Sequence, residues 1–306
     1  MSIAAETNLW PLAALLPHVI AADEDEQAED EDDREAEALA LGERWQEELE
    51  DAVTAWQRRV APEQFAAAVE QIEDAVKAND VEALAALAVP TLGDDLLLEH
   101  MAVMYDEGAA FVVAEAADAG VKIKPAKSPT SVAAWLPMNA GVGETLASWA
   151  LALVLRIGSR TTAGLSNEAL RLYRPGATVA QVTDGVQNYW DGLTDAVPRE
   201  TIGAGLSRAV NLGKLDTYAK PTPRGWRLEL RADERLDRNT CGPCRDIDGT
   251  VLPNADAAGL AYGGAGYLFC KGRERCRGTV RGVWTNKAAK SDFDLGTLLT
   301  GMRELR

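Results

Sequence analysis

The chain has 306 residues, roughly the length of two domains, and 47% of them are hydrophobic, which is enough for a sizeable core. Its net charge of −17 is unevenly spread: residues 1–120 carry 30 acidic and 5 basic side chains, whereas residues 121–306 carry 18 and 26. Only two histidines occur, His18 and His100, and no zinc-protease, serine-hydrolase, Walker or dinucleotide-binding motif is present. The composition therefore argues against the common hydrolase and nucleotide-binding classes.

Two apolar stretches bear on targeting. The longest run, residues 146–155, is too short to span a bilayer. The apolar residues 9–20 lack a preceding basic region and lead directly into acidic residues, which is not typical of a signal peptide. We therefore expect a protein of the reducing cytosol with no membrane partner.

Residues 1–40 form an acidic segment. Between Asp23 and Glu37, 11 acidic residues accompany a single basic one, Arg34. Such a run repels itself and buries little apolar surface, so we predict a disordered or loosely helical segment. We interpret it as a solubilising or interaction tail; mimicry of DNA or capture of a basic partner is the alternative.

Helical periodicity characterises residues 41–219, the predicted helical body. A first apolar stripe comprises Trp45, Leu49, Ala52, Val53 and Trp56, and a second comprises Met101, Met104, Tyr105, Phe111 and Val112. Between them, residues 62–87 are rich in Ala, Glu and Gln, which favour helix. Gly108 and Ala116 share the face of the second stripe, which predicts close packing against another helix.

The remainder of the body is predicted as three further helices. Residues 142–157 are apolar nearly all round, which indicates a central buried helix. A second helix is expected near residues 178–193, and Pro198 is expected in the first turn of a third. The inward face of that third helix would comprise Ile202, Leu206, Ala209, Val210 and Gly213.

The pattern changes at residues 220–223, Lys-Pro-Thr-Pro, which predict a linker or sharp turn. Residues 226–231 alternate strictly and residues 279–284 are similar, so both are predicted strands. Asp248-Gly249 predicts the turn of a β-hairpin between Ile247 and residues 250–252. The expected fold is thus mainly α: a helical body, a small C-terminal α+β module over residues 220–290, and a tail, residues 291–306.

All four cysteines lie in this module: Cys241, Cys244, Cys270 and Cys276. Their spacing is C-x2-C, 25 residues, then C-x5-C. The thiolates of a C-x2-C turn converge on one ion, and a second pair completes a tetrahedron. Five flanking basic residues would stabilise thiolates: Arg245, Lys271, Arg273, Arg275 and Arg277. We therefore predict a structural Zn²⁺ bound by the four cysteines, supplying on the order of 10 kcal/mol of folding free energy to a thin core.

Two other uses of the cysteines stay open. Cys241-Gly242-Pro243-Cys244 has the letters of the thioredoxin motif, so a thiol–disulfide oxidoreductase using Cys241 and Cys244 is one alternative. That reading requires a preceding buried strand and a long following helix, whereas a turn is expected after Cys244. Disulfide pairing in an oxidising medium is the other alternative.

A basic cluster near the last two cysteines offers a different partner. Its members, candidate contacts for phosphates or an acidic protein, are Arg273, Arg275, Arg277 and Arg281. They make a zinc-ribbon-like nucleic-acid-binding protein the alternative function, although Glu274 interrupts the cluster and few aromatic residues accompany it. An enzyme is not expected. Carboxylates near the cysteines could bind a catalytic metal, but Asp248, one of them, is better explained by its place in the predicted turn.

Residues 236–250, with the sequence L-D-R-N-T-C-G-P-C-R-D-I-D-G-T, resemble the C-terminal domain of phage minor head proteins, the Mu F-like head-morphogenesis family. The form is similar to that of actinobacterial phages. The family's second cysteine pair corresponds to residues 266–280, where many relatives have an H-P-x-C-R-C ending and this chain has no histidine. Upstream, residues 202–214 resemble the family's helix with its A-x-N-x-G-R/K ending. The resemblance is specific over residues 195–284, weak over 96–194 and absent from the acidic segment.

The resemblance implies a virion component. It would be a non-enzymatic, low-copy structural protein of the head interior or portal vertex, present in the host cytoplasm during assembly. Its implied partners are the phage portal protein and capsid or scaffold proteins, and its implied role lies in head assembly and genome packaging or delivery. Some family members bind DNA, so phage DNA is a further expected partner.

Overall fold

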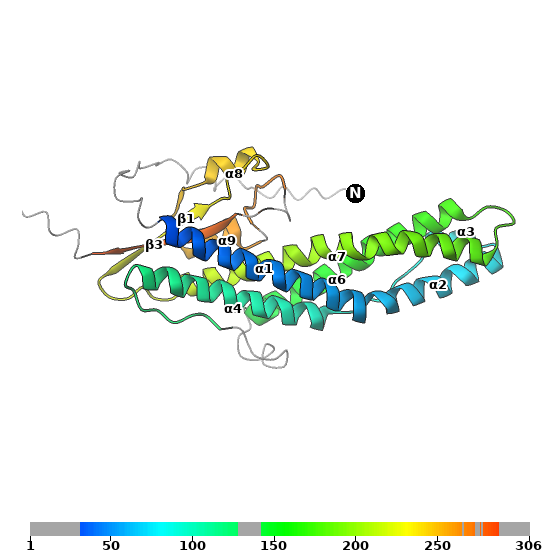
Figure 1. Cartoon of the computed structure of the whole chain (residues 1–306), viewed down its shortest axis with the longest axis horizontal. Coiled ribbons are helices and arrows are strands. Elements are labelled where there is room, and N and C mark those ends of the chain that lie inside the picture. The colour runs from blue at the N-terminus through cyan, green and yellow to red at the C-terminus, as the bar shows by residue number, and fades with distance from the viewer. Residues whose placement is uncertain (1–30, 128–141, 265, 273–275, 277, 288–306) are drawn as a thin grey trace, which may run out of the picture.

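The structure, a computed structural model, describes residues 31–127, 142–264, 266–272, 276 and 278–287. Its elements are α1 (Glu31–Arg59), α2 (Ala61–Ala78), α3 (Val81–Ala85), α4 (Asp94–Asp118), α6 (Val142–Leu172), α7 (Val179–Tyr218), β1 (Trp226–Asp233), α8 (Gly242–Ile247), β2 (Val251–Leu252), α9 (Ala255–Tyr262) and β3 (Thr279–Asn286). Long helices form an elongated body, and the strands with α8 and α9 form a small lobe at one end (Figure 1). The predicted class, mainly α with a small C-terminal α+β module, is confirmed.

One apolar core runs through the helical body. Trp56 of α1, Ile72 of α2, Met104 of α4, Ile157 of α6 and Leu206 of α7 are each at most 1% exposed and belong to the same cluster. Each helix buries one stripe of side chains at the helical period, as the sequence predicts for the first two stripes. No helix in the described part of the chain is long and apolar enough to cross a bilayer.

Helices α4 and α7 approach so closely that their backbones are in contact. A Cβ atom on Gly108 would overlap the carbonyl oxygen of Val210, and a Cβ atom on Gly213 would overlap the carbonyl oxygen of Tyr105. Only glycine fits at these two positions, because the intruding atoms belong to backbone that cannot move aside. The close helix packing predicted from Gly108 is confirmed.

The two helices predicted around Pro198 are a single helix, α7, so the prediction of a helix start at Pro198 is wrong. Proline removes one backbone hydrogen bond, which usually breaks a helix. Here Val186 and Trp190 before the proline, and Ile202 and Leu206 after it, are buried in the same core. Tertiary packing on both sides keeps the helix continuous.

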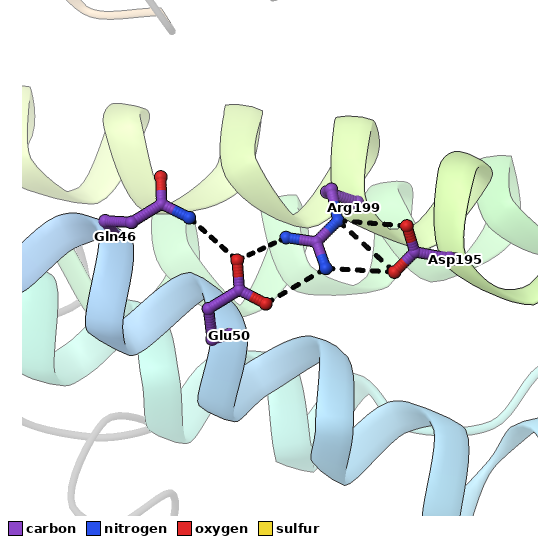
Figure 2. Close-up of polar contacts among 4 residues, drawn as sticks. All are labelled: Gln46, Glu50, Asp195 and Arg199. Atoms are coloured by element: carbon purple, nitrogen blue, oxygen red, sulfur yellow. Dashed lines mark hydrogen bonds and ion pairs between the residues drawn. The ribbon is translucent and has the colours of Figure 1, made fainter.

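Polar contacts beside Pro198 hold α7 to α1 (Figure 2). The guanidinium of Arg199 donates to both carboxylate oxygens of Glu50, at 2.5 and 3.0 Å, and to Asp195 at 2.9 Å. Gln46 donates to the same Glu50 carboxylate at 2.7 Å. The Arg199 hydrogen bonds lower the pKa of the Glu50 carboxyl. We call these contacts of Arg199 the clamp. It lies beside Pro198, where α7 lacks one backbone hydrogen bond.

Two further helices differ from the sequence predictions. Helix α6 continues to Leu172, and it is amphipathic rather than buried all round: Leu151 and Leu155 are 45% and 50% exposed. Helix α1 begins at Glu31, before the boundary expected at residue 40. The remainder of the predicted acidic segment, residues 1–30, and the predicted tail, residues 291–306, lie outside the described residues.

The module contains a three-stranded antiparallel sheet in the order β2-β1-β3. Strand β1 pairs with β3 along its whole length, with Leu230 opposite Gly282, and with β2 through Leu230 and Leu252. The predicted strands are confirmed, but the predicted hairpin at Asp248-Gly249 is wrong, because Ile247 ends helix α8. The turn leads from α8 into β2 and uses the left-handed φ of 71° at Gly249.

A second apolar cluster joins the module to the body. It contains Val112 of α4, Leu215 and Tyr218 of α7, and side chains from the sheet, α8 and α9 such as Leu230 and Tyr262. The ends of α4 and α7 therefore form part of the module's own core.

A partly buried carboxylate and a buried ammonium group lie at the same junction. The Glu115 carboxylate on α4 accepts hydrogen bonds from the Gly282 N–H of β3 at 3.1 Å and from the Tyr218 hydroxyl of α7 at 2.5 Å. The buried Lys214 ammonium lies 3.9 Å from the centre of the Phe111 ring. Burial raises the pKa of Glu115 to about 7 and lowers the pKa of Lys214. These groups fix the orientation of the sheet on the helices.

Candidate metal centre

The four cysteines come together from three separated segments of the module. Cys241 caps the N-terminus of α8 and Cys244 lies within that helix, whereas Cys270 follows α9 and Cys276 precedes β3. All four thiols are free and form one cluster, in which only Cys241 is partly exposed. The structure thus brings together every residue of the predicted metal site.

The loop before Cys241 is shaped by its own side chains. The Thr240 hydroxyl donates to the carbonyl oxygen of Arg235 and accepts from the N–H of Asp237, both at 2.7 Å. The Asp237 carboxylate in turn accepts from the N–H of Asn239 at 2.8 Å. These bonds close a tight turn immediately before α8, which gives Asp237 and Thr240 of the L-D-x-x-T-C-x-x-C pattern a structural role.

Two of the separations between sulfur atoms equal those between ligands of a tetrahedral site. The Sγ atoms of Cys241 and Cys270 are 3.8 Å apart, and those of Cys244 and Cys276 are 3.9 Å apart. A disulfide bond is about 2.05 Å long, so these pairs are not bonded. Thiolates about 2.3 Å from a tetrahedral zinc ion lie about 3.8 Å from one another. The sulfurs of Cys241, Cys244 and Cys270 all lie within 4.8 Å of one another and could hold a metal ion, whereas Cys276 groups within that distance with Cys244 and the Glu234 carboxylate.

Backbone N–H groups point at the sulfur atoms. Lys271 N donates to Cys241 Sγ at 3.4 Å, Gly272 N to Cys270 Sγ at 3.3 Å and Tyr267 N to Cys276 Sγ at 3.3 Å. Hydrogen bonds of this kind favour the charged thiolate. The turn after residue 266 is therefore arranged to support negative sulfur.

The pKa values of the thiols differ with their burial. The N–H groups of Lys271 and Cys244 lower the pKa of Cys241 to about 7. Burial raises the pKa of Cys244 and of Cys276. A cation among the four sulfurs would offset that desolvation, since a coordinating thiol is deprotonated by the metal.

A buried carboxylate, Glu234, adjoins the cluster and was not predicted. It accepts a hydrogen bond from the Tyr262 hydroxyl at 2.8 Å and lies 4.0 Å from Cys276 Sγ. Burial raises its pKa, and a Cβ atom on Gly278 would overlap it. The sequence contained a signal: the alternation of β1 places Glu234 two residues after the buried Ala232, on the inward face.

Asn211 explains the ending A-x-N-x-G-K of the helix before the module. Its side-chain amide donates to the carbonyl oxygen of Gly264 at 3.3 Å, and its side-chain oxygen accepts from the Thr279 hydroxyl at 2.8 Å. Lys214 Nζ also donates to the Thr279 hydroxyl, at 3.3 Å. With the glycine at position 213 against α4, the motif ties α7 to Gly264 and Thr279, which lie on either side of the last two cysteines.

The predicted basic cluster is only partly placed. Arg281 lies on β3 opposite Arg231 and is half-buried, whereas Arg273, Arg275 and Arg277 lie outside the described residues. Two other cations flank the cysteines as predicted: Arg245 is exposed on α8, and Lys271 is exposed directly after Cys270.

A short helix, rather than the turn expected after Cys244, occupies the position of the thioredoxin-like motif, but the long helix that this alternative requires is not formed. Cys241 does cap a helix, as a reactive thiol would need. That helix, however, has only six residues, and Cys241 Sγ lies 3.8 Å from Cys270 Sγ, within a cluster of four rather than in an isolated pair. The arrangement suits coordination better than dithiol exchange.

Comparisons with known proteins identify no relative of this chain. Neither a protein-family model, nor a curated protein, nor a solved structure matches the chain.

Proposed function

We propose that this chain is a minor head protein of a tailed bacteriophage, a non-enzymatic structural protein whose C-terminal module is held together by one Zn²⁺ bound to Cys241, Cys244, Cys270 and Cys276. The observation that carries the proposal is the sulfur cluster itself. Four sulfurs, of which two pairs lie 3.8 and 3.9 Å apart, come from the same residues that resemble the Mu F-like family. Tetrahedral sulfur ligation is typical of zinc or of iron–sulfur centres, and zinc suits a site with no redox role.

Burial and ligand number support a structural role for the metal. A catalytic zinc retains an open position beside three protein ligands, whereas four thiolates leave none. Three of the four cysteines are buried, and backbone N–H groups donate hydrogen bonds to the sulfurs of Cys241, Cys270 and Cys276. The zinc would stabilise a module whose apolar core is small.

Charge supports an acidic partner for the module. Residues 220–287 carry 13 basic and 8 acidic side chains, in contrast to the acidic N-terminal part of the chain. Arg238, Arg245 and Lys271 are exposed around the cysteine cluster. We propose that this face contacts the portal protein, a capsid or scaffold protein, or phage DNA during head assembly.

Incorporation into phage heads tests the function. Peptide mass mapping of purified heads and procapsids should find the wild-type chain in low copy. Reversing the charges of Arg238, Arg245 and Lys271 to Glu should lower incorporation at least about tenfold, the effect of losing roughly 1.4 kcal/mol of binding free energy. The matched control reverses Lys77 and Arg171, which are exposed on the body and pair only within their own helices.

Two results would contradict the proposal. One is the absence of the chain's peptides from heads and procapsids alike; the other is equal incorporation of the module variant and the control. A filter-binding titration of duplex DNA at two salt concentrations then separates a DNA partner from a protein partner, because phosphate contacts weaken steeply with salt.

A further inference from the structure

Three large apolar side chains, called the ridge below, are exposed on the module where the end of α9 meets the turn that follows it. The ridge consists of Leu260, Leu268 and Phe269, which are 64%, 58% and 51% exposed. The Leu268 N–H donates to the carbonyl oxygen of Ala261, so the turn after α9 folds back beside Leu260. The Phe269 ring packs edge-on against Tyr267, with ring centres 5.6 Å apart. Large apolar side chains exposed together in this way usually mark a binding surface.

Cations border the ridge. Lys271 follows Cys270 directly, and its N–H donates to Cys241 Sγ, which brings the ridge next to the start of α8. Arg245 on α8 donates to the carbonyl oxygen of Asp237, so Arg238 lies in the adjoining turn. Arg238, Arg245 and Lys271 are exposed, as are two carboxylates on the neighbouring helices, Asp246 of α8 and Asp256 of α9. The surface combines exposed apolar area with an excess of basic charge.

The N-terminal residues of the same chain have the complementary composition. Residues 9–20 contain seven large apolar side chains: Leu9, Trp10, Leu12, Leu15, Leu16, Val19 and Ile20. Residues 1–30 carry seven acidic side chains and neither Lys nor Arg, and six of the acids follow Ile20. Residues 288–306, by contrast, carry three acidic and three basic side chains and so have no net charge to match the cations. Charge complementarity therefore favours the N-terminal segment as the occupant.

The fold brings this segment to the correct end of the molecule. Trp45 and Leu49 of α1 lie against Gly203, and Glu50 pairs with Arg199, so α1 runs antiparallel to α7. The start of α1 consequently lies towards the end of α7 from which the module continues (Figure 1). An extended chain covers up to about 3.5 Å per residue, so the stretch from Ile20 to the first residue of α1 can span up to about 38 Å.

We propose that residues 9–30 dock on the ridge of their own chain, with the apolar residues covering Leu260, Leu268 and Phe269 and the acidic residues facing Arg238, Arg245 and Lys271. A tether of this length gives an effective concentration of about 1 mM, so an intrinsic Kd of about 0.1 mM keeps about nine-tenths of the molecules docked. An acidic partner must displace the segment to reach the module. The inference depends on the module's surface and not on the proposed role in phage heads.

Hydrogen exchange of the isolated protein tests the docking. The full chain is compared with a chain that begins at Glu31, which retains all of α1. Backbone N–H groups of residues 260–271 should exchange about tenfold faster in the shorter chain, because docking at nine-tenths occupancy slows exchange by that factor. Exchange in residues 148–157 of α6, which also carry exposed leucines, should not change. Equal exchange of residues 260–271 in both chains overturns the proposal.

Charge variants provide the matched control. Neutralising the six acidic residues between Asp23 and Asp30 should reproduce the faster exchange of residues 260–271. Neutralising three exposed acids of α1, Glu43, Glu47 and Asp51, should not. The same response to both changes would show a general charge effect and would contradict specific docking.

A photo-reactive residue at position 12 identifies the occupied surface directly. In a mixture of isotope-labelled and unlabelled full chains, cross-links should join position 12 to residues 260–271 of the same chain. Phe269→Ser should reduce them at least about fivefold at unchanged zinc content, whereas Leu151→Ser, the control on α6, should not. Cross-links mainly to another copy, to another surface of the body, or to residues 288–306 would overturn the proposal.

Discussion

The helical body and the C-terminal module are stabilised in different ways. The body buries one continuous apolar cluster contributed by α1, α2, α4, α6 and α7. The described residues of the module form three strands, two short helices and a small apolar cluster, which includes Val112, Leu215 and Tyr218 of the body. Small cores of this kind commonly need a metal or disulfides. The body should therefore tolerate the loss of a single contact, whereas the module should depend on its four sulfurs.

The largest expected effect is the loss of the proposed metal site. Cys244→Ser should remove bound zinc and unfold residues from Trp226 onward while the helical body stays folded, because a structural zinc supplies on the order of 10 kcal/mol. Elemental analysis measures the zinc, and hydrogen exchange by region measures the folding. Val251→Ser, at an exposed position of β2, is the control and should retain one zinc per chain. A module that stays ordered in a chelator would contradict this prediction.

The next effect concerns the contact between α4 and α7. Gly108→Ala should destabilise the chain by about 3 kcal/mol, because the added Cβ atom meets the backbone of Val210 and forces the helices apart. Gly42→Ala is the matched control on α1, where a Cβ atom has no neighbour within 4 Å. It should stabilise the chain by up to about 1 kcal/mol through helix propensity. Chemical denaturation of both variants gives the comparison, and equal stabilities would show that the close contact is absent.

A smaller effect should depend on pH at the junction of body and module. Burial raises the pKa of Glu115 in the folded chain to about 7, from its ordinary value of 4.5. Burying the charged Glu115 carboxylate therefore destabilises the fold. This destabilisation is fully present above pH 7 and disappears as the pH falls towards 4.5. Between pH 8 and pH 5 the wild type should gain on the order of 2 kcal/mol relative to Glu115→Gln. Denaturant titrations at several pH values measure the difference.

A second variant checks the assignment to Glu115. The Tyr218 hydroxyl donates to this carboxylate and lowers its pKa. Tyr218→Phe should therefore move the pH transition to higher pH, and Glu115→Gln combined with Tyr218→Phe should show no transition. A transition that persists unchanged in the double variant would belong to another group.

The smallest expected effect is at the clamp between α1 and α7. Arg199→Ala should cost less than about 1 kcal/mol, because its partners Glu50 and Asp195 are half exposed and solvent screens the pairs. The loss should shrink further at high salt. Arg171→Ala, which breaks a pair within α6 only, should cost less still. Thermal melts at two salt concentrations distinguish them, and a loss of several kcal/mol at Arg199 would show that the clamp holds α7 together at Pro198.

Local patterns predicted much of this fold, and tertiary contacts account for the differences. The stripe at Trp45 and Trp56, the alternation of β1 and the glycine at position 108 each report on their own neighbourhood, and each was confirmed. The helix start predicted at Pro198 was wrong because buried residues on both sides of the proline keep the helix continuous. The prediction that Leu151 and Leu155 are buried was wrong because an apolar residue does not itself reveal which face of a helix is covered.

The candidate site shows the same division. The spacing of the cysteines predicted their gathering, since two pairs from one module can reach a single ion. Glu234 and Asn211 were not predicted, because their partners Tyr262, Gly264 and Thr279 lie tens of residues away in sequence. Contacts of that range depend on how β1 and α7 are placed, which no local pattern reveals.

The length of α7 has a mechanical consequence. Its 40 residues make a rod of about 60 Å, well over the diameter of a small domain. One end of this rod packs against α2, and the other is built into the lobe with the four sulfurs. The helix therefore holds the module at a set distance from the end of the body that contains α2, and bending it would change that distance.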